Sequence, residues 1–418
     1  MNPWLIFLVV VLAGHLLLEW LIGYLNLGAL SSTLPAEYQG IYSDTDYARS
    51  QEYTRATTKL SLLSASVSTG LTLLFIVGGG FNWVDLQARS FGLGEIWTGL
   101  IFCGILILLS FLLNLPFSLY STFIIEEKFG FNRTTLATFC LDTLKAALLL
   151  VVIGGTLLAL IQWFFIATGA YAWLYCWLGV VLFSLLIHFL APIIILPLFN
   201  TFTPLAPGSL RDAIQGYAVA QQYKIAGIFT MDGSKRSTKL NAFFTGFGKF
   251  KKIVFFDTLV EKLSEDEIVA VLAHEMGHLK HRHILKMLFF SIIQTGLMFA
   301  LLSLMLNNQM LFSAFAMENL SVYGSLVFFS LLYSPVSTLA SLLANYYSRK
   351  HEFEADAYVA HSTSSPEALI TALKVLSKEN LSNLTPHPAQ VFFHYSHPPV
   401  LARISALRRG TNLAEEDI

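Results

Sequence analysis

Residues 271–283 read Val-Leu-Ala-His-Glu-Met-Gly-His-Leu-Lys-His-Arg-His, and this stretch sets two imidazoles one helical turn apart with a carboxylate between them. Positions i and i+4 of a helix share one face, so His274 and His278 can converge on one cation while Glu275 activates a water molecule. A helix is expected because Ser264 to Glu267 has the form of a capping box and an apolar face follows it. The spacing is typical of a hydrolytic zinc site.

The composition around this motif is that of a membrane protein. Hydrophobic residues make up 55% of the chain and charged residues only 13%, whereas soluble proteins carry about 25% charged residues. Seven stretches are long enough to span a bilayer, and they lie near residues 3–26, 60–81, 96–122, 143–168, 171–197, 284–307 and 322–347. We therefore predict an all-α integral membrane protein with seven transmembrane helices and a small α+β zinc-protease region on the cytoplasmic side.

The basic residues predict the orientation of these spans. With the N-terminus outside, the segments on the inner side hold 23 of the 26 Lys and Arg residues, and such residues concentrate in cytoplasmic loops. The zinc helix then faces the cytoplasm. Two strand-like runs at 225–229 and 251–256 predict a small sheet beside it.

Charge and cysteine content exclude other classes of site. The net charge is −1, and no basic stripe with interleaved aromatic residues indicates nucleic-acid binding. The three cysteines lie in or beside apolar spans without CxxC spacing, so we expect neither a disulfide framework nor a thiolate zinc site.

A catalytic zinc needs a third protein ligand on the same side of the membrane. The two spans that follow the zinc helix form a hairpin of similar lengths, and the chain returns to the starting level at residues 348–357. On a continuing helix, Glu352 and Asp356 share a face and Glu354 is turned away. We predict Glu352 as the third ligand and Asp356 as the acceptor that orients a ligand imidazole. The alternative is a solvated charged end of a membrane helix. His281 and His283 are expected to be ordinary polar residues of the membrane boundary.

Further motifs occur in a consistent order along the chain. They are EEKFGFN at 126–132, PLFNTFTPL at 197–205, KLNAFFTG at 239–246, SRKHEFEADAYV at 348–359 and SHPP at 396–399. Together with HEMGH at 274–278, they resemble the type I CAAX prenyl protease family of membrane-embedded zinc metalloproteases. Phe243 stands where the family pattern has Tyr.

This resemblance implies one catalytic Zn²⁺ bound by His274, His278 and Glu352, with Glu275 as general base. It further implies that Asn241 opens an edge strand for an extended substrate. By the same similarity, His397 donates a hydrogen bond to the tetrahedral intermediate and Arg403 holds His397 or the substrate. The expected partners are membrane lipids and a peptide or protein substrate, either lipid-modified (CAAX-type) or otherwise membrane-associated.

Four regions are expected: an N-terminal membrane domain of five spans (1–200), a catalytic region with the zinc helix (201–283), a transmembrane hairpin (284–347) and a C-terminal catalytic segment (348–418). Two alternatives stay open at this point. One is a heat-shock-type membrane quality-control metalloprotease, and the other is a transporter or scaffold with a vestigial zinc motif. The chain has no long insertion of the eukaryotic kind, which favours a bacterial cell (inner) membrane.

Overall fold

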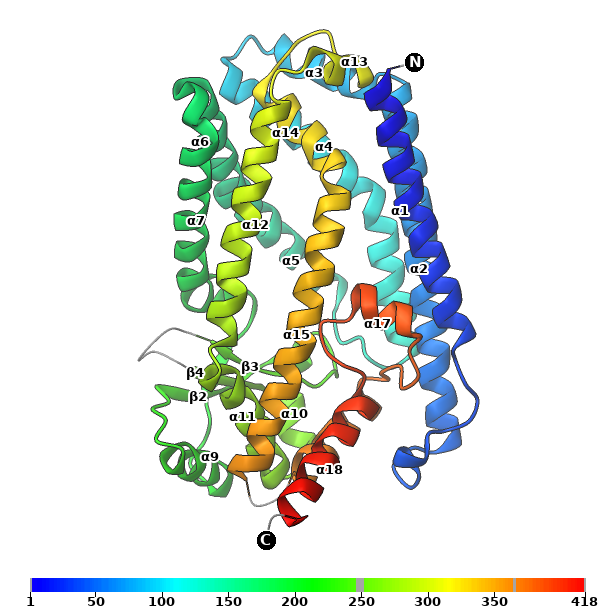
Figure 1. The fold of residues 1–418 in the computed structure, drawn as a ribbon, viewed down its shortest axis with the longest axis vertical. Coiled ribbons are helices and arrows are strands. Elements are labelled where there is room, and N and C mark those ends of the chain that lie inside the picture. The colour runs from blue at the N-terminus through cyan, green and yellow to red at the C-terminus, as the bar shows by residue number, and fades with distance from the viewer. Residues whose placement is uncertain (1, 246–251, 364–365, 417–418) are drawn as a thin grey trace.

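The computed structural model describes residues 2–245, 252–363 and 366–416, and its long helices run along one axis with the two termini at opposite ends (Figure 1). Among the described residues, six helical stretches are long and apolar enough to cross a membrane. They are α1 (Pro3–Gly28), α2 (Asp44–Val77), α4 (Glu95–Tyr120) with the π turn to Glu126, α5 (Leu136–Leu149) with α6 (Gly155–Ala167), α7 (Ala172–Leu190) with α8 (Leu196–Phe199), and α12 (His283–Met305).

The seventh span differs from the single helix predicted at 322–347. It consists of α14 (Val322–Leu332) and α15 (Ser334–Ser362), which meet at an angle of 55°. Pro335 lies in the first turn of α15. Proline has no backbone N–H to donate and its ring clashes with the carbonyl four residues earlier, so an unbroken helix is disfavoured at this point. Counted as one span, the bent pair gives the seven crossings expected.

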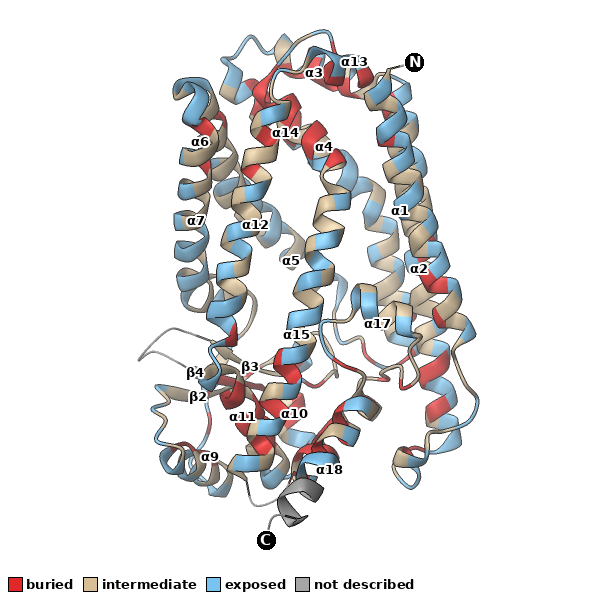
Figure 2. Cartoon of the chain, in the orientation of Figure 1, coloured by how far each residue is buried: buried red, intermediate tan, exposed pale blue. Residues whose placement is uncertain are grey.

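The middle parts of the long helices expose apolar side chains. Leu17 and Leu182 are 69% and 67% exposed, and at most 17% of the residues in the apolar 18-residue window of each of the six candidate spans are buried. Figure 2 shows that buried residues gather at the two ends of the molecule. Such apolar surface is unfavourable in water and favourable in hydrocarbon, which is the expected environment of these helices.

Short helices cover the end of the molecule where the N-terminus lies (Figure 1). They are α3 (Gly80–Ser90) and α13 (Gln309–Ala314), which share an apolar core with α4 and α14. Asp85 is fully buried there and accepts hydrogen bonds from Arg89 and the Tyr323 hydroxyl. This buried pairing ties α3 to α14.

A small mixed sheet lies at the opposite end, as the strand-like runs predicted. Its strands are β1 (Phe202–Pro204), β2 (Gly227–Met231), β3 (Ala242–Thr245) and β4 (Lys252–Phe256), in the order β1-β2-β4-β3. Strands β2 and β4 are parallel and the other two pairs are antiparallel. Because β3 pairs only with β4, it lies at an edge of the described sheet.

Six helices complete this end of the molecule. They are α9 (Ser209–Ala220), α10 (Asp257–Lys262), α11 (Glu265–Lys280), α16 (Glu367–Glu379), α17 (Pro388–His394) and α18 (Val400–Glu416). The sheet residues Ile253 and Phe255 are fully buried and share a core with Leu272 and Met276 of α11. That core fixes one face of α11 against the sheet.

The other side of α11 packs against α15 at a glycine. A Cβ placed on Gly277 would lie 2.9 Å from the Ala355 Cα and 3.1 Å from the Ala355 carbonyl oxygen. Carbon atoms in ordinary contact are about 3.5–4.0 Å apart, so only glycine permits this approach. The contact brings the end of α15 beside the HEMGH motif.

Candidate metal centre

Helix α11 carries His274, Glu275 and His278, and its start is the capping box that the sequence predicts. The Glu267 carboxylate accepts from the Ser264 backbone N–H at 2.7 Å, and the Ser264 hydroxyl accepts from the Glu267 N–H at 3.4 Å. These bonds satisfy two of the free N–H groups at the helix start. The first turn also has three acidic residues, which favour the positive end of the helix dipole.

Three side chains from α11 and α15 converge at one point. The Nε2 atoms of His274 and His278 are 3.2 Å apart. The Glu352 carboxylate, 4% exposed, lies 3.5 Å from the first Nε2 and 3.2 Å from the second. The α12 crossing and most of the α14–α15 crossing lie between His274 and Glu352 in the sequence, yet the two side chains meet in space.

These three groups fit a tetrahedral metal ion. Two nitrogens that each lie about 2.0–2.1 Å from a tetrahedral zinc are about 3.3 Å apart, which matches the Nε2 separation of 3.2 Å. The Nδ1 of His274 faces the Asp356 carboxylate, so a neutral His274 bound to a metal would keep its proton on Nδ1 and present the Nε2 lone pair. Glu352 Oε2 is buried and makes an ion pair with Arg403 Nη1 at 3.2 Å, but it has no hydrogen-bond partner among the described residues. A cation between the three groups satisfies all of these atoms.

A second carboxylate and a guanidinium hold His274 from behind. Asp356 Oδ1 lies 2.9 Å from His274 Nδ1, and Arg403 of α18 donates two hydrogen bonds to Asp356 at 2.7 and 2.8 Å. Burial and the Arg403 charge lower the pKa of His274, but Asp356 and Glu352 outweigh them and raise the pKa to about 9. The two carboxylates therefore make positive charge favourable beside His274.

The remaining predicted residues line one cavity of about 670 Å³ with the three converging groups. Asn241 and the edge strand β3 form one wall, and the 397–403 segment forms another. His397 Nε2 lies 3.4 Å from Glu352 Oε1. Arg403 contacts Glu352 and Asp356 rather than His397 in the described contacts. Burial raises the pKa of Glu275, which also faces this cavity.

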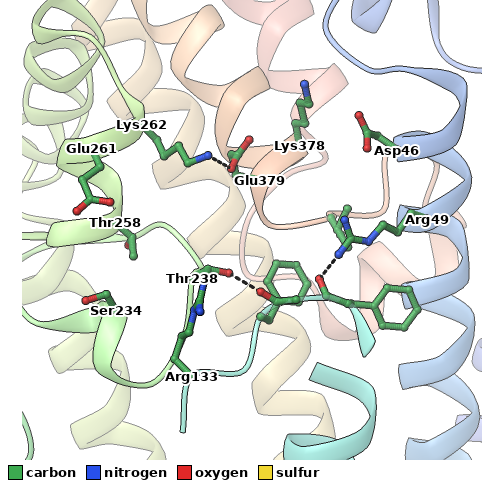
Figure 3. A pocket seen from close by; sticks show the side chains of 14 residues that line it. Asp46, Arg49, Arg133, Ser234, Thr238, Thr258, Glu261, Lys262, Lys378 and Glu379 are labelled. Atoms are coloured by element: carbon green, nitrogen blue, oxygen red, sulfur yellow. Dashed lines mark hydrogen bonds and ion pairs between the residues drawn. The ribbon is translucent and has the colours of Figure 1, made fainter. Parts of the chain in front are cut away.

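The EEKFGFN segment lies beside a different cavity, of about 520 Å³ (Figure 3). Arg49 donates to the Phe129 carbonyl and Thr238 to the Gly130 carbonyl, at 2.6 and 3.1 Å. Glu126 accepts from Lys239, two residues before Asn241. The segment therefore anchors the approach to β3 onto the membrane helices, and this cavity contains none of the predicted ligands.

Sequence reasoning missed the surroundings of His278. His283 was expected to be an ordinary boundary residue, but it is only 3% exposed and its Nδ1 lies 3.0 Å from His278 Nδ1. Its Nε2 lies 2.9 Å from Glu354 Oε2. Arg282 has φ 56°, so the chain leaves α11 in a left-handed turn that returns His283 to the motif. No helical periodicity predicts that return.

Comparison with known proteins supplies the family context. Residues 24–201 match a model described as CAAX prenyl protease N-terminal, five membrane helices, and residues 204–411 match peptidase family M48. A CAAX prenyl protease 1 homolog from Oryza sativa is 37% identical, with 92% of each chain covered. CAAX prenyl protease 1 of Saccharomyces cerevisiae is 34% identical, over 90% of this chain and 89% of its own.

One solved structure aligns with almost the whole molecule. The crystal structure of S. mikatae Ste24p is similar, with a TM-score of 0.92 and 32% sequence identity. The alignment covers 97% of this chain and 99% of the other. The predicted architecture of membrane helices with a small sheet is therefore confirmed by both the fold and the family match.

Proposed function

The chain belongs to the type I CAAX prenyl protease family and is a multi-pass membrane metalloendopeptidase, and we propose that it uses one zinc ion to cut CAAX-type substrates near their C-terminus. The observation that carries this proposal is the convergence of His274, His278 and Glu352 beside Glu275 on the cavity bounded by β3. Two neutral imidazoles, one carboxylate and space for a water molecule are the donor set of a catalytic zinc.

Each side chain has a distinct role in this proposal. When bound, the zinc ion supplies Lewis-acid polarisation of a water molecule and of the peptide carbonyl. Glu275 takes a proton from the attacking water and returns it to the leaving amine, and its burial makes it a stronger base than an exposed carboxylate. His397, at the cavity wall, donates a hydrogen bond to the developing negative charge on the carbonyl oxygen.

Two further groups position the substrate and the ligands. Strand β3 has an unpaired side among the described strands, so an extended peptide can add to it as a neighbouring strand, with Asn241 at its start. Asp356 fixes the proton of His274 on Nδ1 so that Nε2 faces the metal, and Arg403 holds Asp356 in place. In this proposal Arg403 acts on the ligand cluster and not on His397.

The proposed orientation follows from the basic residues. With the N-terminus outside, the catalytic end faces the cytoplasm together with 23 of the 26 Lys and Arg residues. The four regions 1–200, 201–283, 284–347 and 348–418 then correspond to membrane domain, catalytic region, hairpin and C-terminal catalytic segment. The bacterial cell membrane stays a prediction, and the relatives compared above are eukaryotic. Labelling of single cysteines from each side of a vesicle tests the orientation.

The deciding experiment compares the wild type with Glu275→Gln on a farnesylated CAAX peptide and its unprenylated twin. The amide has the shape of the carboxylate but is not a base, so we expect wild-type zinc content and a loss of about 10²–10⁴-fold in kcat. Equal cleavage by both proteins would remove Glu275 as the base. Protein without stoichiometric zinc would favour the vestigial site of a transporter or scaffold. Equal cleavage of both peptides would remove the lipid from the substrate definition.

A further inference from the structure

The side chains of His278, His283 and Glu354 form a hydrogen-bonded chain that leads away from the metal centre. His283 begins α12, and its ring lies between His278 and Glu354 at 3.0 and 2.9 Å. The ring also stacks on that of His351, with centroids 3.9 Å apart and planes at 11°. His283 is 3% exposed and His351 is 6% exposed, so the ring of His283 is fixed on both faces and at both nitrogens.

The donors and acceptors along this chain have one consistent assignment. His278 faces the metal position through Nε2, so a neutral His278 carries its proton on Nδ1. That proton points at Nδ1 of His283, which must accept it. His283 then carries its own proton on Nε2 and donates it to Glu354. Only this assignment of protons gives each of the two hydrogen bonds, His278 to His283 and His283 to Glu354, one donor and one acceptor.

We propose that His283, held by Glu354, is a positioning residue that fixes the tautomer and ring orientation of His278. This inference rests on the proposed metal centre. Each ligand imidazole is then backed by a carboxylate: His274 directly by Asp356, and His278 by Glu354 through a second imidazole. Such partners orient metal-binding imidazoles and make them more basic ligands.

A second cation offers a competing explanation for the same residues. His281, His283 and Glu354 place three ligand atoms within 4.8 Å of one another. A cation on either nitrogen of His283 would replace one of its two hydrogen bonds and break the donor order that leads to His278. Glu354 is also 3.8 and 3.9 Å from the ammonium groups of Lys286 and Lys350, which already offset its charge. The contacts therefore favour the hydrogen-bonded chain.

The test compares two variants, His283→Asn and His283→Leu, whose new side chains are similar in size. Asn retains an oxygen near the position of Nδ1 that accepts the His278 proton, whereas Leu retains only the volume. We expect His283→Leu to lower zinc affinity by about 10–100-fold, measured as zinc retained against a graded chelator, and His283→Asn to recover most of it. Because a purely structural role would not distinguish Asn from Leu, recovery by Asn identifies the hydrogen bond. The kcat for peptide cleavage should follow zinc occupancy, with KM little changed.

His281→Ala is the matched control, since the His281 side chain is exposed and its ring contacts are with His283 and Tyr358. We expect one zinc per chain in the wild type and in this variant. Two zinc ions per wild-type chain, with one lost in His281→Ala, would overturn the chain in favour of a second cation site. Unchanged zinc affinity in His283→Leu would overturn the positioning role of His283 and leave the proposed metal centre intact. A wild type that binds no zinc would instead refute the proposed metal centre.

Discussion

Gly277→Ala tests whether the approach of α11 to α15 sets the spacing of the metal ligands. The glycine lies between Glu275 and His278, and its Cα faces Ala355, one helical turn from Glu352. An added methyl group meets the Ala355 Cα at 2.9 Å, its carbonyl oxygen at 3.1 Å and its Cβ at 3.2 Å. Two of these three atoms belong to helix backbone, so rotation of a side chain cannot relieve the contact.

The size of the effect follows from these distances. Restoring ordinary contact of about 3.5–4.0 Å requires the two helices to separate by about 0.5–1 Å. Metal–ligand distances tolerate only about 0.2 Å, so Glu352 moves out of reach of an ion held by the two histidines. A misplacement of about 1 Å costs on the order of 100-fold in rate, and we expect that loss in kcat/KM together with weaker zinc retention. Overpacking lowers the free energy of unfolding by about 1–3 kcal/mol.

The assay measures zinc content, kcat/KM and thermal unfolding on the same detergent-solubilised samples. Gly216→Ala is the matched control, because Gly216 lies within α9 and a Cβ there meets no atom within 4 Å. It should leave activity unchanged and gain about 0.5–1 kcal/mol in helix stability. Adding Ala355→Gly to Gly277→Ala removes only the 3.2 Å contact, so rescue should be partial. Zinc binding and turnover within twofold of the wild type in Gly277→Ala would refute the reasoning.

Three further predictions concern the same end of the molecule. Activity should fall as the pH drops through the pKa of Glu275, which burial raises above the ordinary glutamate value of 4.5. The acid limb of the kcat/KM profile should therefore have its midpoint above pH 4.5, and a midpoint at or below pH 4.5 would contradict the effect of burial. Arg403→Met removes the guanidinium shared by the buried carboxylates of Glu352 and Asp356 and should cost about 3–5 kcal/mol in urea unfolding, whereas the exposed Arg409→Met should change it by at most about 0.5 kcal/mol. Lys239→Met loosens the approach to Asn241 and should raise KM about fivefold or less with kcat retained, and a loss confined to kcat would contradict this role.

Much of this site was predictable because its parts follow local rules. A capping box and an i, i+4 pair predict a helix that presents His274 and His278 on one face. The length of two successive spans predicts that the chain returns near Glu352, since both cross the same thickness of hydrocarbon. Of the four described strands, apolar runs between turn residues located two, at 225–229 and 251–256, and the family resemblance indicated a third, the edge strand that follows Asn241.

The rest depended on geometry that no period describes. Successive residues of a helix turn by about 100°, so a continuous α11 would place His283 about 140° away from His278. The left-handed backbone conformation of Arg282 interrupts the helix and brings the rings of His278 and His283 together. In the seventh span, hydropathy gave the length, but the 55° bend depends on Pro335, a residue to which a hydropathy average is insensitive.

The charged groups of the site come from three separate helices, α11, α15 and α18. When ionised, Glu275, Glu352 and Asp356 carry three negative charges against the single positive charge of Arg403, so the buried cluster has a net charge of −2 without a metal. Buried charge of this size is strongly unfavourable, and without a metal a proton on His274, whose pKa is raised to about 9, reduces it to −1. A divalent cation in place of that proton makes the cluster neutral. Because α11, α15 and α18 each contribute part of that charge, the ion stabilises the packing of helices that two membrane crossings separate in sequence.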